Sequence, residues 1–154
     1  MDKISTFLWF DNQAEEAVNF YVSVFKNSKI KQVSRYPEGS PGPAGSVMVV
    51  SFDLDGREFL ALNGGPHFKF TEAISLVVNC DTQEEIDYYW EKLSAGGKEA
   101  QCGWLKDKYG LSWQVVPKVI GSLMRDPEKA KRVMAAVMKM VKLDIAAMER
   151  AANG

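Results

Sequence analysis

Two segments of the chain share the pattern of a β-strand followed by a helix, and they lie 69 positions apart. In the first copy residues 4–10 (ISTFLWF) precede residues 12–21 (NQAEEAVNFY), and in the second residues 73–80 (AISLVVNC) precede residues 81–90 (DTQEEIDYYW). A shift of 69 places Asn12 on Asp81 and Tyr21 on Trp90. A duplicated module of this kind is typical of a pseudo-symmetric fold with a cavity between its halves.

Further strand patterns extend each copy to a βαβββ module, which predicts an α+β fold. The expected strands are residues 29–36, 46–54 and 57–63 in the first module, and 98–102, 103–106 and 111–116 in the second. Asp55-Gly56 suits the tight turn of a hairpin. With 154 residues and 46% apolar composition, the chain can bury one core, so we expect a single domain. Module one is predicted at residues 1–66 and module two at residues 67–120.

A C-terminal helix is predicted over residues 126–150. Asp126 is a typical N-cap, and Pro127 suits the first turn of a helix. The apolar stripe of this segment, which includes Val133, Val137 and several methionines, is too wide for a fully solvated helix. We expect it to pack on the protein's own sheet, and docking on a partner subunit is the alternative.

Composition argues against several classes of partner. Nineteen basic and 20 acidic residues give a net charge of −1, so neither nucleic acid nor an anionic membrane is expected to attract the chain. No apolar run reaches 18 residues and no signal-peptide pattern opens the chain, which predicts a cytoplasmic protein. Cys80 and Cys102 fit neither a CxxC motif nor a zinc pair, so both are expected to be free thiols.

Several short motifs follow one another in a specific order: FLWF at 7–10, AEEAVNFY at 14–21, ALNGGP at 61–66, QEEIDYYW at 83–90 and CGWLKDKYGLSWQ at 102–114. In this order the chain resembles the PhnB-like branch of the vicinal oxygen chelate (glyoxalase/bleomycin-resistance) superfamily, a branch often labelled as a 3-demethylubiquinone 3-methyltransferase domain. The similarity runs over nearly the whole chain, including the final helix. The resemblance implies two βαβββ modules that curl into a partly open barrel, often completed by a symmetric homodimer.

The resemblance also implies where a metal would bind, because metal-using relatives take two ligands from each module, one from the first strand and one from the last. Here those positions fall near Thr6, Ala61 or Asn63, Ser75 and Gln114. Divalent metals in this chemistry favour imidazoles and carboxylates, which these positions lack. We therefore predict no metal and no cofactor. The residues predicted to line the cavity are Thr6, Asn63, His67, Ser75 and Gln114.

The function favoured by these residues is binding of a small apolar or aromatic molecule without a catalytic metal. One alternative is a metal-dependent lyase, isomerase or dioxygenase of the same superfamily, and another is a dimeric scaffold without a small ligand. A methyltransferase is disfavoured, because no glycine-rich turn follows a strand. His67 is the only histidine and the first candidate for a base at neutral pH, although a lone histidine on a linker is more often structural. Whether the chain catalyses a reaction stays open.

Overall fold

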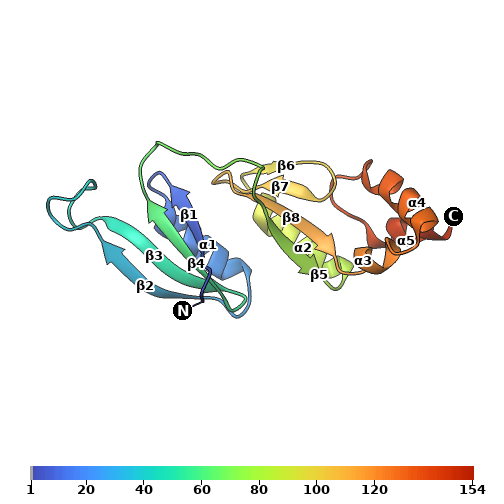
Figure 1. Cartoon of the computed structure of the whole chain (residues 1–154), viewed down its shortest axis with the longest axis horizontal. Coiled ribbons are helices and arrows are strands. Elements are labelled where there is room, and N and C mark those ends of the chain that lie inside the picture. Colours follow the sequence, from blue (N-terminus) through green and yellow to red (C-terminus); the bar gives the residue numbers. More distant parts are fainter. Residues whose placement is uncertain (1) are drawn as a thin grey trace. The chain divides into compact units, whose positions relative to one another are not determined.

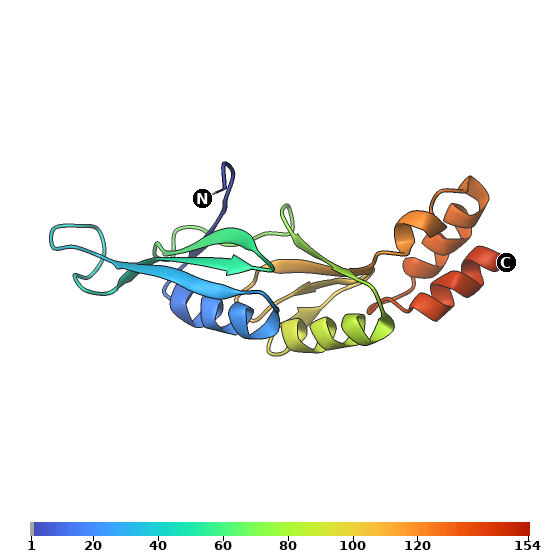
Figure 2. The ribbon, with the colours of Figure 1, turned by 90° about the horizontal axis from the view of Figure 1, so that it is seen from below.

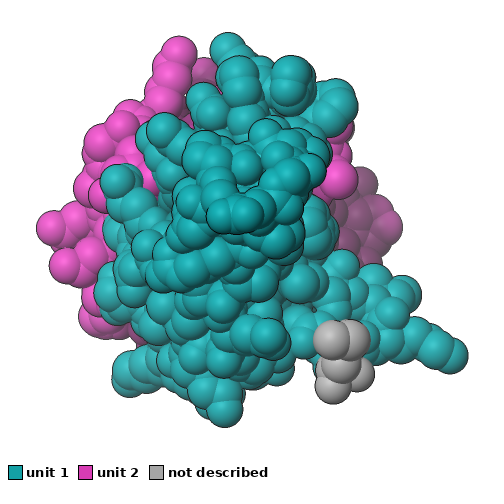
Figure 3. All heavy atoms as spheres, turned by 90° about the vertical axis from the view of Figure 1, so that its left-hand side faces the viewer, with its two compact units in different colours: residues 1–70 teal, residues 71–154 magenta. Residues whose placement is uncertain are grey.

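The computed structural model describes residues 2–154, which form two compact units, and the chain passes from one to the other between Phe70 and Thr71 (Figures 1 and 3). This boundary lies just beyond the predicted one at residues 66 and 67. Each unit contains one complete βαβββ module in the predicted order. The C-terminal helices belong to the second unit.

The first unit is a four-stranded sheet with one helix on one of its faces (Figures 1 and 2). Its elements are β1 (Thr6–Phe10), α1 (Ala14–Val24), β2 (Lys29–Arg35), β3 (Val47–Leu54) and β4 (Arg57–Asn63). The strand order is β1-β4-β3-β2, in which β1 and β4 are parallel and the other pairs antiparallel. The side chains between α1 and the sheet, such as Val18, Tyr21 and Phe52, are fully buried. The opposite face, which no helix covers, is called the open face below.

The second unit repeats this arrangement. Its elements are β5 (Leu76–Cys80), α2 (Gln83–Ser94), β6 (Lys98–Glu99), β7 (Trp104–Lys106) and β8 (Ser112–Pro117), and the strand order is β5-β8-β7-β6. Thr82 caps α2, since its side chain accepts from the Glu85 N–H at 3.2 Å. Strand β6 is shorter than predicted because the chain turns at Cys102, whose φ of 63° lies in the left-handed region.

The connection between the first strand and the helix is one residue longer in the first module than in the second. Residues 11–13 join β1 to α1, whereas only Asp81 and Thr82 join β5 to α2. The helices therefore correspond at a shift of 69, but the preceding strands correspond at a shift of 70. Because strand side chains alternate between faces, this single residue decides which side chains of the two modules are equivalent.

The C-terminal segment is helical as predicted, but it forms more than one helix. A short helix α3 (Ile120–Leu123) precedes α4 (Pro127–Val137) and α5 (Ile145–Asn153). The predicted continuous helix over 126–150 is wrong between α4 and α5, where Asp144 begins a new helix by accepting from the Ala147 N–H at 3.0 Å. Among residues 2–154, no helix is long and apolar enough to cross a membrane.

The apolar stripe of the C-terminal helices packs within its own unit. Its buried residues are Val133, Val137, Leu143, Met148 and Ala152, and Cys102 and Val116 of the module pack against them. Backbone contacts reinforce this docking, since the N–H groups of Cys102 and Gly103 donate to the carbonyls of Met140 and Val141, both at 2.8 Å.

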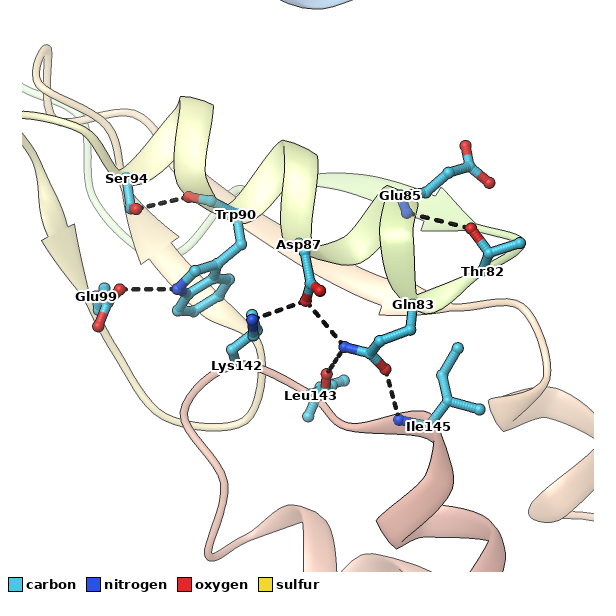
Figure 4. A network of polar contacts seen from close by, with 10 residues as sticks. All are labelled: Thr82, Gln83, Glu85, Asp87, Trp90, Ser94, Glu99, Lys142, Leu143 and Ile145. Carbon is cyan, nitrogen blue, oxygen red and sulfur yellow. Dashed lines mark hydrogen bonds and ion pairs between the residues drawn. The ribbon is translucent and has the colours of Figure 1, made fainter.

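A polar clamp holds the chain just before α5 (Figure 4). The amide of Gln83, in the first turn of α2, donates to the Leu143 carbonyl at 3.1 Å and accepts from the Ile145 N–H at 2.8 Å. Gln83 also donates to Asp87, which forms an ion pair with Lys142 at 2.7 Å. One glutamine side chain thus satisfies two backbone groups of a segment about 60 residues later.

Candidate functional site

Ser75 and Gln114 meet on the open face of the second sheet. Buried Val78 and Val115 are paired across β5 and β8 on the side of α2, so the alternating residues Val77 and Gln114 face the opposite way. The Gln114 Nε2 donates to the Ser75 Oγ at 3.0 Å. The structure therefore brings these two predicted site residues together, one just before the first strand of the module and one on its last strand.

The first unit carries a charged counterpart on its own open face. Ser5, equivalent to Ser75 at the shift of 70, donates to the Glu58 carboxylate. The other Glu58 oxygen lies 2.8 Å from the Lys31 Nζ, which is also 3.1 Å from an Asp53 carboxylate oxygen. Only 6% of the Glu58 side chain is exposed. We call Ser5, Lys31, Asp53 and Glu58 the charged cluster.

Hydrogen bonding within the charged cluster favours the ionised forms of Glu58 and Lys31. The hydrogen bond from Lys31, followed by that from Ser5, lowers the pKa of Glu58 below its ordinary value. The same contact with Glu58, followed by that with Asp53, raises the pKa of Lys31. The cluster is thus an ammonium held between two carboxylates near neutral pH.

Thr6 and Asn63, both predicted to line the cavity, lie instead on the face covered by α1. Thr6 is paired with Phe59 and alternates with buried Leu8, which places it on the helix side. The Asn63 Oδ1 accepts from the Ala14 N–H at 2.8 Å, and its Nδ2 donates to the Val47 carbonyl at 3.1 Å. Asn63 therefore supplies a side-chain cap for α1, and both ends of its amide are engaged.

His67 lies in the exposed segment that follows β4, close to Gly65. This segment covers Trp9, whose Nε1 donates to the Gly65 carbonyl at 2.9 Å and whose ring meets Phe68 edge-on at 4.8 Å. Gly64 lies directly over the indole, where a Cβ would be 2.4 Å from Trp9. The segment packs by its glycines and Phe68, while His67 is exposed to solvent.

A pocket of about 340 Å³ lies on the open face of the second sheet, next to the Ser75–Gln114 pair. Trp104 and Lys106 of β7 are paired with Gln114 and Ser112 of β8, so these side chains share that face. The residues lining the pocket are Glu72, Ala100, Gln101, Trp104, Leu105, Lys106 and Ser112. Lys106 and Glu72 form an ion pair at the pocket.

The hydroxyl of Ser112 is the one buried side-chain polar atom with no hydrogen-bond partner among the residues that the structure describes. The residue is 1% exposed. Leaving a buried hydroxyl unpaired costs about 1–3 kcal/mol, and an ordered water, an ion, local strain or a functional role can account for such a group in a native protein. Ser112 borders the pocket, but its hydroxyl oxygen is enclosed and does not open into it.

The two thiols lie outside this pocket. Cys80 is buried at the end of β5, and burial, together with the nearby carboxylates of Glu85 and Asp81, raises its pKa to about 12. Cys102 is half-buried against the C-terminal helices. Both cysteines are free, as predicted.

Sequence reasoning missed Glu58 and Lys31 as open-face residues. The sequence could have placed Glu58 on this face. Residues 58, 60 and 62 are two positions apart along β4, so Glu58 shares a face with Leu60 and Leu62. For Ser112, the predicted strand over 111–116 already placed it on the same face as Gln114. The missing hydrogen bond of its hydroxyl depends on the packed neighbours and has no sequence signature.

A family model described as 3-demethylubiquinone-9 3-methyltransferase matches residues 2–116. A PhnB protein of Bacillus cereus, described as a putative 3-demethylubiquinone-9 3-methyltransferase, is 44% identical, with a TM-score of 0.69 over 75% of this chain and 99% of its own. The chain belongs to the PhnB-like family of the vicinal oxygen chelate superfamily. The model match ends within β8, so the expected similarity over the final helices lies outside it.

Two solved structures of lower identity share the fold. Protein PA1353 of Pseudomonas aeruginosa is 19% identical, with a TM-score of 0.63 over 76% of this chain and 98% of its own. The fosfomycin resistance protein FosX of Listeria monocytogenes is 16% identical, with a TM-score of 0.59 over 82% of this chain and all of its own. None of the curated proteins searched matches the chain.

Proposed function

We propose that this PhnB-like protein binds a small apolar or aromatic molecule on the open face of its second sheet, without a catalytic metal. The observation that carries the proposal is the pocket beside Trp104, whose lining is almost wholly apolar and includes the indole. Its volume of about 340 Å³ lies at the lower end of the range for ligand pockets, about 300–1,000 Å³. The Ser75–Gln114 pair next to it supplies polar groups that orient a ligand.

The donor set of the open faces does not fit a divalent metal. The polar pairs on the open faces of the two modules, Ser5–Glu58 and Ser75–Gln114, offer a single carboxylate. That carboxylate already binds Lys31, whose ammonium repels a cation. Among residues 2–154, no group of three or more histidine, cysteine, aspartate or glutamate side chains is placed to hold a metal ion. The chemistry of these residues therefore favours binding over a metal-dependent reaction.

A homodimer is part of the same proposal. Phe7 and Val77 occupy equivalent open-face positions of the two modules, and they are 53% and 48% exposed. Uncovered apolar side chains on the open face of the edge strands β1 and β5 favour association with another surface. Light scattering coupled to gel filtration tests this expectation, and a monomer at micromolar concentration would contradict it.

The function is tested by elemental analysis of protein purified without a histidine tag, followed by thermal-shift screening with metals and with aromatic compounds. We expect no stoichiometric metal and a rise in melting temperature with an aromatic ligand. Gln114→Ala should reduce that rise, whereas Gln32→Ala, a control on the exposed β2, should not. Stoichiometric zinc, nickel, manganese or iron would favour the lyase, isomerase or dioxygenase alternative. No response to any compound would favour the scaffold.

A further inference from the structure

The turn between β6 and β7 supplies part of the lining of the pocket. Ala100, Gln101 and Trp104 line the pocket and belong to residues 100–104, which we call the wall turn. Within it, the Ala100 N–H donates to the Trp104 carbonyl at 2.9 Å, and the Trp104 N–H donates to the Gln101 carbonyl at 3.2 Å. The two residues enclosed by these bonds, Cys102 and Gly103, therefore help to set where the lining residues stand.

Cys102 and Gly103 hold an uncommon backbone conformation. Their φ angles, 63° and 82°, both lie in the left-handed region. A non-glycine residue such as Cys102 enters this region at a cost in free energy, and it stays there only where neighbouring groups hold it. The shape of the wall turn therefore depends on contacts from outside the turn.

The C-terminal segment supplies those contacts. The N–H groups of Cys102 and Gly103 donate to the carbonyls of residues 140 and 141, both at 2.8 Å. Leu143, which is 1% exposed, lies over Gly103, where an added Cβ would be 3.0 Å from the leucine Cγ. These contacts come from beyond residue 116, at which the match to the family model ends.

Gln83 links this packing to α2 (Figure 4). Its amide donates to the Leu143 carbonyl and accepts from the Ile145 N–H, which fixes the backbone that carries Leu143. A continuous series of contacts thus runs from Gln83 through Leu143 and Gly103 to the wall turn. All of these residues belong to the second unit.

We infer that the C-terminal helices hold the pocket in its binding shape, so that helix docking and ligand binding strengthen each other. This inference rests on the proposed function and adds to it a positioning residue, Leu143, which touches the wall turn and not the ligand. When the helices are docked, the wall turn keeps its left-handed residues; when they are released, it relaxes and the lining residues move. A ligand therefore binds the docked state more tightly, and by linkage it stabilises docking by the same factor.

The first test needs no ligand and uses hydrogen exchange. The N–H groups of Ala100 and Trp104 are bonded within the wall turn and not to the helices, so their exchange reports on the turn itself. Gln83→Ala should make them exchange at least about fivefold faster, together with the amides of residues 140–150. The control Gln13→Ala should change neither. Faster exchange confined to residues 140–150 would overturn the inference, because the turn would then keep its shape without the helices.

The second test measures binding of 2-naphthol, a neutral aromatic probe, to the full chain by calorimetric titration. Leu143→Ala should weaken binding by at least about fivefold, within the usual range for coupled sites, and Leu143→Met should restore most of the affinity. Gln83→Ala should weaken binding in the same direction, and it leaves the core intact if Leu143→Ala does not fold. Affinities equal to that of wild type in these variants would overturn the inference.

A matched truncation separates positioning from stability. Met148 is buried in the same core cluster as Leu143, so Met148→Ala should lower the melting temperature. It should nevertheless leave the affinity for 2-naphthol within about twofold of wild type, because Leu143 still covers the wall turn. An equal loss of affinity in Met148→Ala and Leu143→Ala would contradict the role given to Leu143.

The reciprocal effect completes the test and distinguishes the inference from the proposed function. Saturating 2-naphthol should slow exchange of the α5 amides, although the pocket is lined by other elements, while the α1 amides of the first unit stay unaltered. If 2-naphthol binds wild type and all variants equally and leaves α5 unaltered, the coupling is wrong and the proposed function stands. If neither 2-naphthol nor any other neutral arene binds, both fail.

Discussion

Trp113 and Asp107 are joined by a buried hydrogen bond, in which the indole Nε1 donates to Oδ2 at 2.9 Å. The other oxygen of Asp107 accepts from the N–H groups of Tyr109 and Leu111, at 2.9 and 3.1 Å. Asp107 is 3% exposed, so one buried carboxylate organises the turn between β7 and β8. Trp113 packs on the side of α2, which leaves Ser112 and Gln114 on the open face.

Replacing Asp107 by alanine is therefore expected to destabilise the protein by about 2–4 kcal/mol, because three donors lose a charged acceptor in the interior. Urea unfolding followed by tryptophan fluorescence and circular dichroism measures this loss. Glu91→Ala, an exposed change on α2, is the control and should lie within about 0.5 kcal/mol of wild type. A similar loss in both variants would refute the role given to Asp107.

Gln83 should govern how firmly the C-terminal helices dock. Gln83→Ala removes the partners of the Leu143 carbonyl and the Ile145 N–H, and we expect a loss of about 1–2 kcal/mol. Gln83→Glu should be at least as damaging, since a carboxylate cannot donate to Leu143 and is repelled by Asp87. Hydrogen exchange measures the effect as faster exchange of the amides of residues 140–150. Gln13→Ala, which removes an exposed glutamine with no cap hydrogen bond, should leave that exchange unaltered.

The charged cluster predicts how stability depends on pH. The pKa of Glu58 is lowered in the folded protein, so its contribution is fully present above the ordinary value of 4.5 and is lost as pH falls through the lower folded value. The pKa of Lys31 is raised, so its contribution is present below 10.5 and is lost as pH rises through the higher folded value. Glu58→Gln should flatten the fall in the urea midpoint below about pH 4.5. If this variant and Glu91→Gln fall in parallel with wild type, Glu58 does not cause the acid loss.

Cys80 should be chemically inert in the folded protein. Its raised pKa, about 12, and its burial keep it a thiol at pH 8, and only the thiolate is an effective nucleophile. A disulfide reagent such as Ellman's reagent should therefore release the same number of equivalents from native wild type and from native Cys80→Ser. In urea, where Cys80 becomes accessible, the wild type should react with one more equivalent of the reagent than Cys80→Ser does. Fast native labelling of Cys80 would show that β5 opens readily.

The order of elements was accessible from the sequence, but the face of each site residue was not. Alternation and hairpin chemistry predicted residues 57–63 as a strand, and β4 spans Arg57–Asn63. The repeat at a shift of 69 aligned the helices correctly and paired Thr6 with Ser75. The shorter connection between β5 and α2 makes Ser5 the true counterpart, because one residue reverses the face of a strand.

The end of α4 also could not be predicted from the sequence. Apolar residues continue through 138–143, so the hydrophobic pattern gave no sign that α4 ends there. The break depends on the backbone pairing of Met140 and Val141 with the turn at Cys102 and Gly103, a contact between segments distant in sequence. Such pairing is set by tertiary structure and overrides local helical preference.

In the segment before α5, the Gln83 side chain hydrogen-bonds to backbone groups and not to side chains. A carbonyl at position 143 and an N–H at position 145 are present for nearly any amino acid, so the anchor tolerates sequence drift in the segment that it holds. Only proline at position 145 removes a group that Gln83 uses. A residue within the family-matched region can in this way keep a C-terminal extension attached while the surface of that extension diversifies.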